Sequence, residues 1–262
     1  MRSQRKVASS PSSQDERHGP PECRIPNAES PPSLLTLFPV RDSFRRMEQL
    51  LIALPILIFS VVLHEIAHGW VARSQGDPTA AMLGRLTLNP IPHLDPIGSV
   101  LVPAVLALMP GGIIFGWARP VPVNPRNFRN YKRGDILVSL AGVAVNFLLA
   151  IAFTLLMVVV AWGVRLAPEA AGVWQVLGEM ARYGVLINFV LMLFNLIPIP
   201  PLDGSHVMYH LLPPHLAVRY RELGRFGMLF VFAFLFLGGF RFLWIPLQWL
   251  YGAAMSLAQL LI

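Results

Sequence analysis

The stretch LLIALPILIFSVVLHEIAHGWVA, residues 50–72, sets the structural class of this protein. It is almost entirely apolar, and an apolar run of about 20 residues can cross a bilayer as a helix. Its only ionisable side chains are His64, Glu65 and His68. Ionisable groups are costly inside a membrane and usually have a function there. The stretch therefore predicts a membrane helix that carries a functional site.

The composition of the whole chain supports the same class. Of its 262 residues, 55% are hydrophobic and 13% are charged, whereas a soluble domain carries about 25% charged residues. The single cysteine, Cys23, excludes an intrachain disulfide and a cysteine-based metal cluster. The net charge is +7, with basic residues mainly in the N-terminal tail and short loops. That distribution favours membrane topology signals over a nucleic-acid surface, so we expect a lipid bilayer as partner and no nucleic acid.

The apolar segments predict an all-α polytopic membrane protein with five to six transmembrane helices. These segments are 50–72, 97–117, 136–164, 185–199 (with a possible start near 172), 226–240 and 242–262. The segment 97–117 is broken by Pro103, Pro110, Gly111 and Gly112, so we expect it to be re-entrant and to return as extended chain. Residues 1–46 are rich in Ser, Pro and charge, which predicts a disordered tail and leaves 47–262 as one membrane domain.

The motif His64-Glu65-Ile66-Ala67-His68 predicts a metal site. Residues four apart share one face of a helix, so both imidazoles can bind one ion, and Glu65 lies beside them as a candidate general base. Zinc is the expected metal, because it accepts histidine nitrogen and carboxylate oxygen from three protein ligands at catalytic sites. The candidates for a third ligand are Asp203, His93, Asp95, His206 and His210. Asp203 follows a proline-rich break that would turn a carboxylate inward.

Three motifs together resemble the site-2 protease family of intramembrane zinc metalloproteases. They are HEIAH at 64–68, SLAGVAVNFLLA at 139–150 and NLIPIPPLDG at 195–204. The stretches GDPTAAMLGRLTLNPIPHLDPIGS (76–99) and FGWARPVPVNPRNFRN (115–130) resemble a small bacterial branch of that family without PDZ or CBS domains. The resemblance covers about residues 47–210. It implies a zinc-dependent endopeptidase that cleaves membrane-protein substrates in or near their transmembrane segments.

The resemblance also implies roles for individual residues. His64, His68 and Asp203 would bind Zn²⁺, and Glu65 would be the catalytic base. Asn146 would hydrogen-bond the scissile carbonyl or its oxyanion, although Val143 replaces the family's proline in this motif; a helix–helix contact is the alternative interpretation of Asn146. The residues expected to line the cleft or support it are His93, Asp95 and Asn195, with hydrogen bonding in a turn as the alternative for the first two.

A shared metal site would also constrain the topology. The histidines and Asp203 each follow most of an apolar segment, so segments 50–72 and 185–199 should run parallel, with one full crossing between them. The basic residues on the side reached by the ends of these segments favour a cytoplasmic active site in a bacterial inner membrane: Arg73, Arg85, Arg119, Arg126, Arg129, Lys132, Arg133, Arg219, Arg221 and Arg225. Arg165, Arg241 and the tail lie opposite; the tail's arginines oppose this orientation unless translation starts at Met47.

A different functional class could use the same residues. A membrane metal-ion transporter would use the His/Asp site for transit and would need no general base, so Glu65 favours the protease. The sequence specifies neither an oligomeric state nor a particular substrate.

Overall fold

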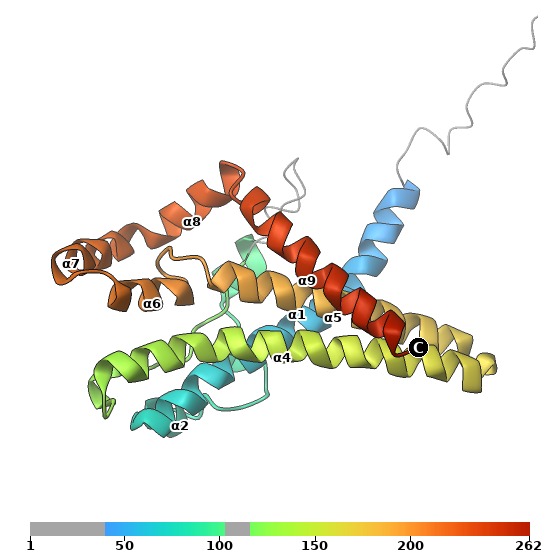
Figure 1. The fold of residues 1–262 in the computed structure, drawn as a ribbon, viewed down its shortest axis with the longest axis horizontal. Helices are drawn as coiled ribbons and strands as arrows, with labels where there is room; N and C mark the ends of the chain where they lie inside the picture. The colour runs from blue at the N-terminus through green and yellow to red at the C-terminus, as the bar shows by residue number, and fades with distance from the viewer. Residues whose placement is uncertain (1–39, 103–115) are drawn as a thin grey trace, which may run out of the picture. The chain divides into compact units, whose positions relative to one another are not determined.

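The computed structural model describes residues 40–102 and 116–262, with side chains from residue 51 onward apart from residue 100. The chain divides into two units, 1–43 and 44–262, and the second contains every predicted site residue. All regular structure in the described ranges is helical, which confirms the all-α prediction (Figure 1). Residues 1–39 of the predicted tail and 103–115 of the predicted re-entrant segment lie outside the described residues. The predicted boundary after residue 46 falls within a helix that begins at Val40.

The described helices have the following bounds. The α-helices are α1 (Val40–Gln75), α2 (Thr79–Met82), α4 (Tyr131–Leu166), α5 (Ala171–Asn195), α6 (Asp203–Leu211), α7 (Pro214–Leu223), α8 (Gly227–Phe236) and α9 (Phe240–Leu260). Short helical turns connect them: η2 (Ile91–His93), η3 (Pro96–Leu101), η4 (Pro125–Asn127), η5 (Pro168–Ala170) and η6 (Gly224–Phe226).

The described part of the chain contains three or four candidate membrane spans, and the expectation of five to six is corrected accordingly. Three helices are long and apolar enough, namely Leu51–Gln75, Tyr131–Leu166 and Pro168–Asn195. A fourth arises only if Pro214–Phe236 and Phe240–Leu260, bent by 72° at their junction, form one broken span. The segment 226–240 is too short to cross alone, because its helix covers only Gly227–Phe236. It therefore joins the following segment as half of a bent pair.

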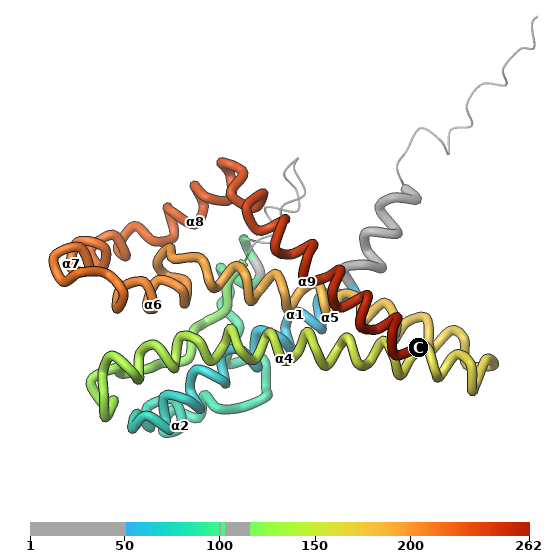
Figure 2. Tube along the Cα trace, in the orientation of Figure 1, coloured from blue at the N-terminus to red at the C-terminus, as the bar shows by residue number. Residues whose placement is uncertain are grey.

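Helices α4 and α5 form an antiparallel hairpin that supplies most of the core, and α9 packs across it (Figure 2). The two helices pack closely, because Gly163 lies against the Trp174 ring near their connection and Gly184 lies against the Phe153 ring farther along. The buried residues of this core are Val143, Ala150, Val185, Phe189, Met192, Leu247 and Ala254. The hairpin thus provides a rigid support for the helix that carries the histidines.

Helix α1 lies against the hairpin in the direction required by a shared metal site. Along α1, His68 pairs with Val138 and His64 with Asn146, so α1 and α4 are antiparallel. Ser60 pairs with Asn188 of α5, whereas His64, farther along α1, meets Asp203, which follows α5. Helices α1 and α5 therefore run parallel, as the sequence predicts.

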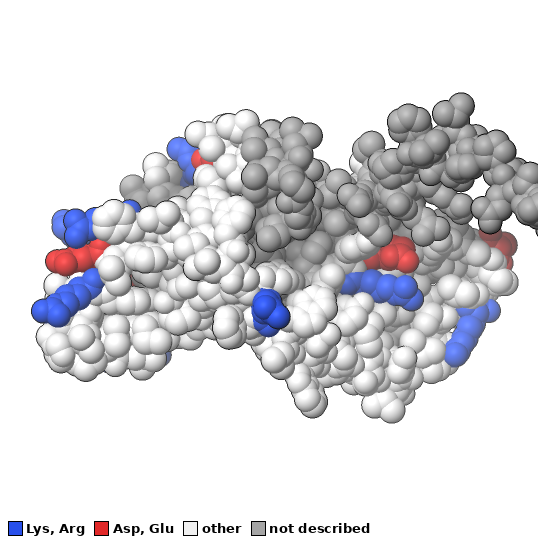
Figure 3. Space-filling model, turned by 90° about the horizontal axis from the view of Figure 1, so that it is seen from above, with Lys and Arg blue, Asp and Glu red and all other residues white. Residues whose placement is uncertain are grey.

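The surface of the second unit suits a lipid environment. Large apolar side chains are exposed along α4, including Phe147, Leu148, Ile151, Leu155 and Val159. In the view of Figure 3, most of the surface is neither acidic nor basic, and the few charged side chains lie mainly toward its two ends. Exposed apolar surface of this extent is unusual in a water-soluble monomer. Together with the apolar helices, it indicates a membrane protein.

Candidate metal centre

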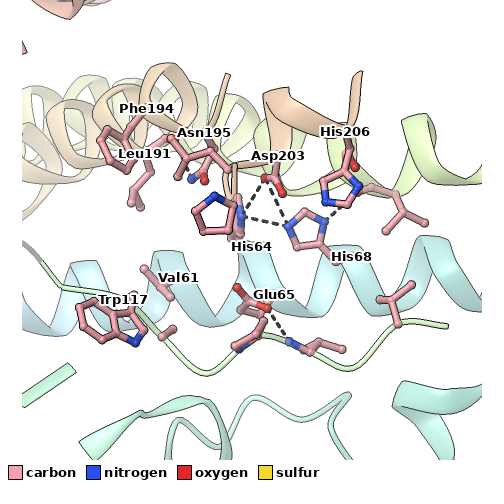
Figure 4. A pocket seen from close by; sticks show the side chains of 18 of the residues that line it. Val61, His64, Glu65, His68, Trp117, Leu191, Phe194, Asn195, Asp203 and His206 are labelled. Carbon is pink, nitrogen blue, oxygen red and sulfur yellow. Dashed lines mark hydrogen bonds and ion pairs between the residues drawn. The ribbon is translucent and has the colours of Figure 1, made fainter. Parts of the chain in front are cut away.

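Three side chains predicted as metal ligands meet at one point. The Nε2 atoms of His64 and His68 lie 3.0 Å apart. Asp203 Oδ2 lies 3.3 Å from the His64 nitrogen and 3.5 Å from the His68 nitrogen. All three side chains point toward one another in Figure 4. The three side chains are therefore neighbours, and their donor atoms form a group that could hold a metal ion.

The spacing of the three donor atoms fits Zn²⁺. Zinc bonds of about 2.0–2.1 Å in tetrahedral geometry place neighbouring ligand atoms roughly 3.3 Å apart. The observed separations of 3.0, 3.3 and 3.5 Å bracket that value. In addition, Asp203 Oδ2 is buried without a hydrogen-bond donor. A buried carboxylate oxygen normally has a partner, and a cation between the three atoms would supply it.

Each ligand is positioned by its own local sequence. The histidines lie four residues apart on α1 and share one face of that helix. Asp203 is the first residue of α6, directly after the proline-containing turn that ends α5. The next residue must be small, because a Cβ at Gly204 would lie 2.2 Å from the Leu196 carbonyl oxygen. The turn can therefore fold back tightly and bring Asp203 beside the histidines.

The far nitrogens of both histidines are held by the protein. His68 Nδ1 donates to the Val138 carbonyl oxygen at 2.7 Å. His64 Nδ1 donates to Asn146 Oδ1 at 2.6 Å. A proton on each Nδ1 leaves the Nε2 lone pairs directed at the metal position, which is the usual arrangement behind metal-bound histidines. The rings are therefore preorganised for binding through Nε2.

The direction of the His64 hydrogen bond is fixed by a buried chain of amides. Asn188 Nδ2 donates to the Gly184 carbonyl oxygen at 2.8 Å and to Ser60 Oγ at 2.9 Å. Because a carbonyl only accepts, the other Asn188 atom must be the oxygen, and it accepts from Asn146 Nδ2 at 3.0 Å. Asn146 therefore turns its own oxygen to His64, and this network joins α1, α4 and α5.

Asn146 occupies a different place from the one expected. It is fully buried and is absent from the residues that line the cavity at the metal centre. Its amide oxygen faces the rear nitrogen of His64, and its amide nitrogen faces Asn188. The expected contact with a scissile carbonyl is thus not the contact seen here, because the side chain lies behind the ligand. Gly142 lies beside it on α4, and a Cβ there would lie 2.5–2.7 Å from the His64 ring.

Glu65 lies in the cavity next to the ligands and contacts the opposite wall. Its Oε2 accepts a hydrogen bond from the Val121 backbone N–H at 2.8 Å. That wall is residues 116–124, which form neither helix nor strand and run along α1 (Figure 4). Pro120 and Pro122 flank the donor and have no N–H of their own. Glu65 is therefore oriented by one backbone group of an irregular, proline-restrained segment.

The cavity has a volume of about 480 Å³ and contains the whole candidate centre. It is enclosed by parts of α1, α4, α5, α6 and α8 and by the wall segment 116–124. Its polar lining residues are His64, Glu65, His68, Asp135, Ser139, Asn195, Asp203 and His206. The irregular wall thus lies across the cavity from the three candidate ligands.

A buried carboxylate anchors the end of the wall segment. Asp77 accepts hydrogen bonds from the Asn124 backbone N–H at 2.7 Å, from Asn127 Nδ2 at 2.8 Å and from Thr79. Burial acts to raise the pKa of Asp77, but these hydrogen bonds outweigh it and hold the pKa below its ordinary value. The carboxylate thus ties the end of α1 to the chain that enters α4.

The remaining predicted site residues divide into supporting and lining positions. His93 is buried away from the cavity, with Nε2 against the Thr87 carbonyl oxygen at 3.0 Å. Asp95 accepts hydrogen bonds from the backbone N–H groups of Ile97 and Gly98. Both therefore support the turn, as the hydrogen-bonding alternative predicted, and neither lines the cavity. Asn195 does line it, with its amide nitrogen bonded to the Leu191 carbonyl oxygen.

A second polar cluster lies at the cavity and contains His206 and His210, which the sequence offered only as candidate third ligands. Neither belongs to the group of three that could hold a metal ion, and their pairing with Asp135 was not predicted. Asp135, near the start of α4, lies 2.8 Å from His210 Nε2 and 3.3 Å from His206 Nδ1. The hydrogen bond from His206 to Asp135, opposed by burial, raises the pKa of His206. The spacing of the two histidines, four apart on α6, was the available signal. Their carboxylate partner, Asp135, lies far away in the sequence, so only the fold shows the pairing.

The chain is similar to proteins named as zinc metalloproteases. It is 43% identical over 182 residues to YwhC of Bacillus subtilis, covering 69% of this chain and 77% of that protein. It is 36% identical over 159 residues to Rip2 of Mycolicibacterium smegmatis, and 33% identical over 159 residues to Rip2 of Mycobacterium tuberculosis. In both Rip2 matches, 61% of this chain aligns with 55% of the relative. No family model and no solved structure matches the chain.

Proposed function

Because the chain belongs to the zinc metalloprotease family that includes YwhC, we propose that it is an intramembrane endopeptidase of the site-2 type. The observation that carries the proposal is the convergence of His64, His68 and Asp203 in one cavity with Glu65. The histidines and Glu65 belong to a helix apolar enough to cross a membrane. The substrate would be a membrane protein cleaved in or near a transmembrane segment. The transporter alternative finds no support among the relatives.

The metal would be held by His64, His68 and Asp203. When bound, zinc supplies a Lewis acid that acidifies a water molecule and polarises a peptide carbonyl. Asn146 and the Val138 carbonyl orient the two imidazoles from behind. These contacts keep Nε2 of both histidines available without reorganisation, which favours tight and specific metal binding.

Glu65 would carry the proton through the reaction. Its carboxylate lies in the cavity beside the ligands and is held by the Val121 N–H. It would accept the proton of the attacking water and later give a proton to the leaving amine. The same contact places Glu65 against the wall segment 116–124, so a substrate lying along that wall would present its backbone to the carboxylate.

The substrate would have to be extended where it is cut. In a helix, the peptide bond is surrounded by side chains and its carbonyl is already hydrogen-bonded. An unwound stretch could lie between the ligand cluster and the irregular wall, whose prolines prevent that wall from becoming helical. This supports cleavage near the end of a transmembrane segment, where unwinding costs least.

We place the active site toward the cytoplasmic side of a bacterial inner membrane. The basic residues lie around the end of α1, around the start of α4 and after α6. In the sequence, these positions are near the residues of the candidate centre. Positive residues in short loops favour the cytoplasm. Cysteine labelling of loop positions in intact cells tests this: a cysteine at 130 should be protected, and one at 167 should be labelled.

The proposed chemistry is tested by Glu65→Gln. The amide cannot take a proton, so we expect at least a 100-fold loss of cleavage with zinc content unchanged. The assay is release of peptides from fluorescein-labelled casein, an unfolded chain, in detergent, with zinc measured by atomic absorption. Glu179→Gln is the matched control, because Glu179 lies on α5 beside Arg182 and away from the cavity. Cleavage by Glu65→Gln at the parent rate would exclude the proposed mechanism.

A further inference from the structure

Negative charge develops on the carbonyl oxygen of a peptide bond as water attacks, and a hydrogen-bond donor there would stabilise it in addition to a bound metal. Asn146 is poorly placed for this, since it is fully buried behind His64 and its amide contacts His64 and Asn188. A donor must lie on the cavity side of the ligands. The candidates are therefore the polar residues that line the cavity and are not ligands or the proposed base.

His206 has the required position. It lies on α6, one helical turn after Asp203, and lines the same cavity as His64, Glu65 and His68. In Figure 4, its ring lies beside His68 and Asp203. Its side chain is 51% exposed, so a peptide in the cavity can reach it. Ser139 and Asn195 also line the cavity; Asn195 uses one of its two amide N–H groups on the Leu191 carbonyl oxygen, whereas His206 has a buried carboxylate as partner.

A buried carboxylate orients the His206 ring. Nδ1 lies 3.3 Å from Asp135 Oδ1, and Asp135 is only 8% exposed. The carboxylate is itself fixed by His210 at 2.8 Å. A carboxylate at Nδ1 favours the imidazolium, in which Nδ1–H donates to Asp135 and Nε2–H remains to donate elsewhere. An Asp–His pair of this kind supplies a directed, charged donor.

We infer that His206, oriented by Asp135, is a catalytic residue that donates a hydrogen bond from Nε2 to the carbonyl oxygen of the scissile peptide bond. This rests on the proposed function and adds a residue to it. No proton changes place in this step, because the hydrogen bond strengthens as charge develops on the oxygen. Asp135 is a positioning residue, since it acts through His206.

The test compares His206→Leu, His206→Gln and Asp135→Asn in the full-length protein with labelled casein as substrate. Loss of one such donor lowers kcat by about 100- to 1000-fold, so we expect that loss for His206→Leu with KM nearly unchanged. The glutamine side chain can place an N–H near the Nε2 position, so the kcat of His206→Gln should be at least tenfold higher than that of His206→Leu. Asp135→Asn should lower kcat by less than His206→Leu.

Zinc affinity separates this role from a structural one. A chelator competition with each variant should give the parent affinity, since His206 is not a ligand. The control is His215→Leu, which changes an exposed histidine on α7 and should leave both kcat and zinc affinity at the parent values. A His206→Leu protein that cleaves within twofold of the parent, or loses zinc in proportion to kcat, would overturn the inference alone. A parent that binds zinc and cleaves nothing would overturn the proposed function and this inference with it.

Discussion

Asn146 offers the sharpest test of how the centre is built, because two roles for it predict different results. If it positions His64, then Asn146→Leu should weaken metal binding. If it contacts the substrate, the same change should leave metal binding intact and abolish cleavage. The structure favours the first role, since the amide oxygen accepts from His64 Nδ1 at 2.6 Å and the side chain is fully buried.

The size of the effect depends on the contacts that would be lost. Leucine would leave the His64 Nδ1–H and the Asn188 Oδ1 without a partner. Each unpaired buried group costs about 1–3 kcal/mol. Only the His64 group is coupled to the metal, so the affinity should fall roughly 5- to 150-fold at about 1.4 kcal/mol per tenfold. Loss of a hydrogen bond behind a metal ligand typically costs about 10- to 100-fold, which agrees.

The assay is a competition between the protein and a chromophoric chelator for zinc, repeated with Co²⁺, whose absorption reports ligand geometry. Asn146→Asp keeps an acceptor for His64 and should retain the parent affinity. Thr154→Val is the matched control, because Thr154 is buried in the same helix and its hydroxyl donates to the Ala150 carbonyl oxygen of that helix. Unchanged zinc affinity in Asn146→Leu, together with loss of cleavage, would refute the positioning role.

Three further changes probe the support of the site. Gly142→Ala should lower zinc affinity at least tenfold, because its Cβ would lie within 2.7 Å of the His64 ring. The control is Gly178→Ala, whose Cβ would lie 3.6 Å from its nearest neighbour. This control should leave zinc binding unchanged and stabilise α5 by up to about 1 kcal/mol in thermal unfolding. Gly204→Ala should lose zinc and stability together, since the backbone at Leu196 cannot yield, and a folded, zinc-loaded variant would contradict this. Asp77→Asn should destabilise the protein by about 1.5–3 kcal/mol near neutral pH. The pKa of Asp77 in the folded protein lies below its ordinary value. The extra stability of the parent over Asp77→Asn should therefore be complete above about pH 4 and disappear as the pH falls through the folded pKa. Thermal unfolding at several pH values measures this difference.

The sequence by itself indicated which residues could bind a metal ion, and it determined the all-α class of the fold. Histidines four apart share one face of a helix and can bind one ion together, and ionisable groups in an apolar segment usually have a function there. The choice of Asp203 among the candidate third ligands came from the resemblance to a known family. The parallel direction of α1 and α5 followed from the same reasoning. These conclusions hold because helical periodicity and the cost of burying charge are local properties of the chain.

The tertiary structure decided everything that depended on partners distant in sequence. Whether Asn146 faces the substrate or the back of His64 is set by Asn188, 42 residues away along the chain. Whether His206 is a third metal ligand or a separate residue of the cavity depends on Asp203 and on Asp135, which lies 71 residues away from His206. The described residues contain three or four candidate spans for a similar reason, since two apolar segments meet at a 72° bend and count as a span only if they are taken together. Hydropathy reports how apolar a segment is, but packing decides what its polar groups meet.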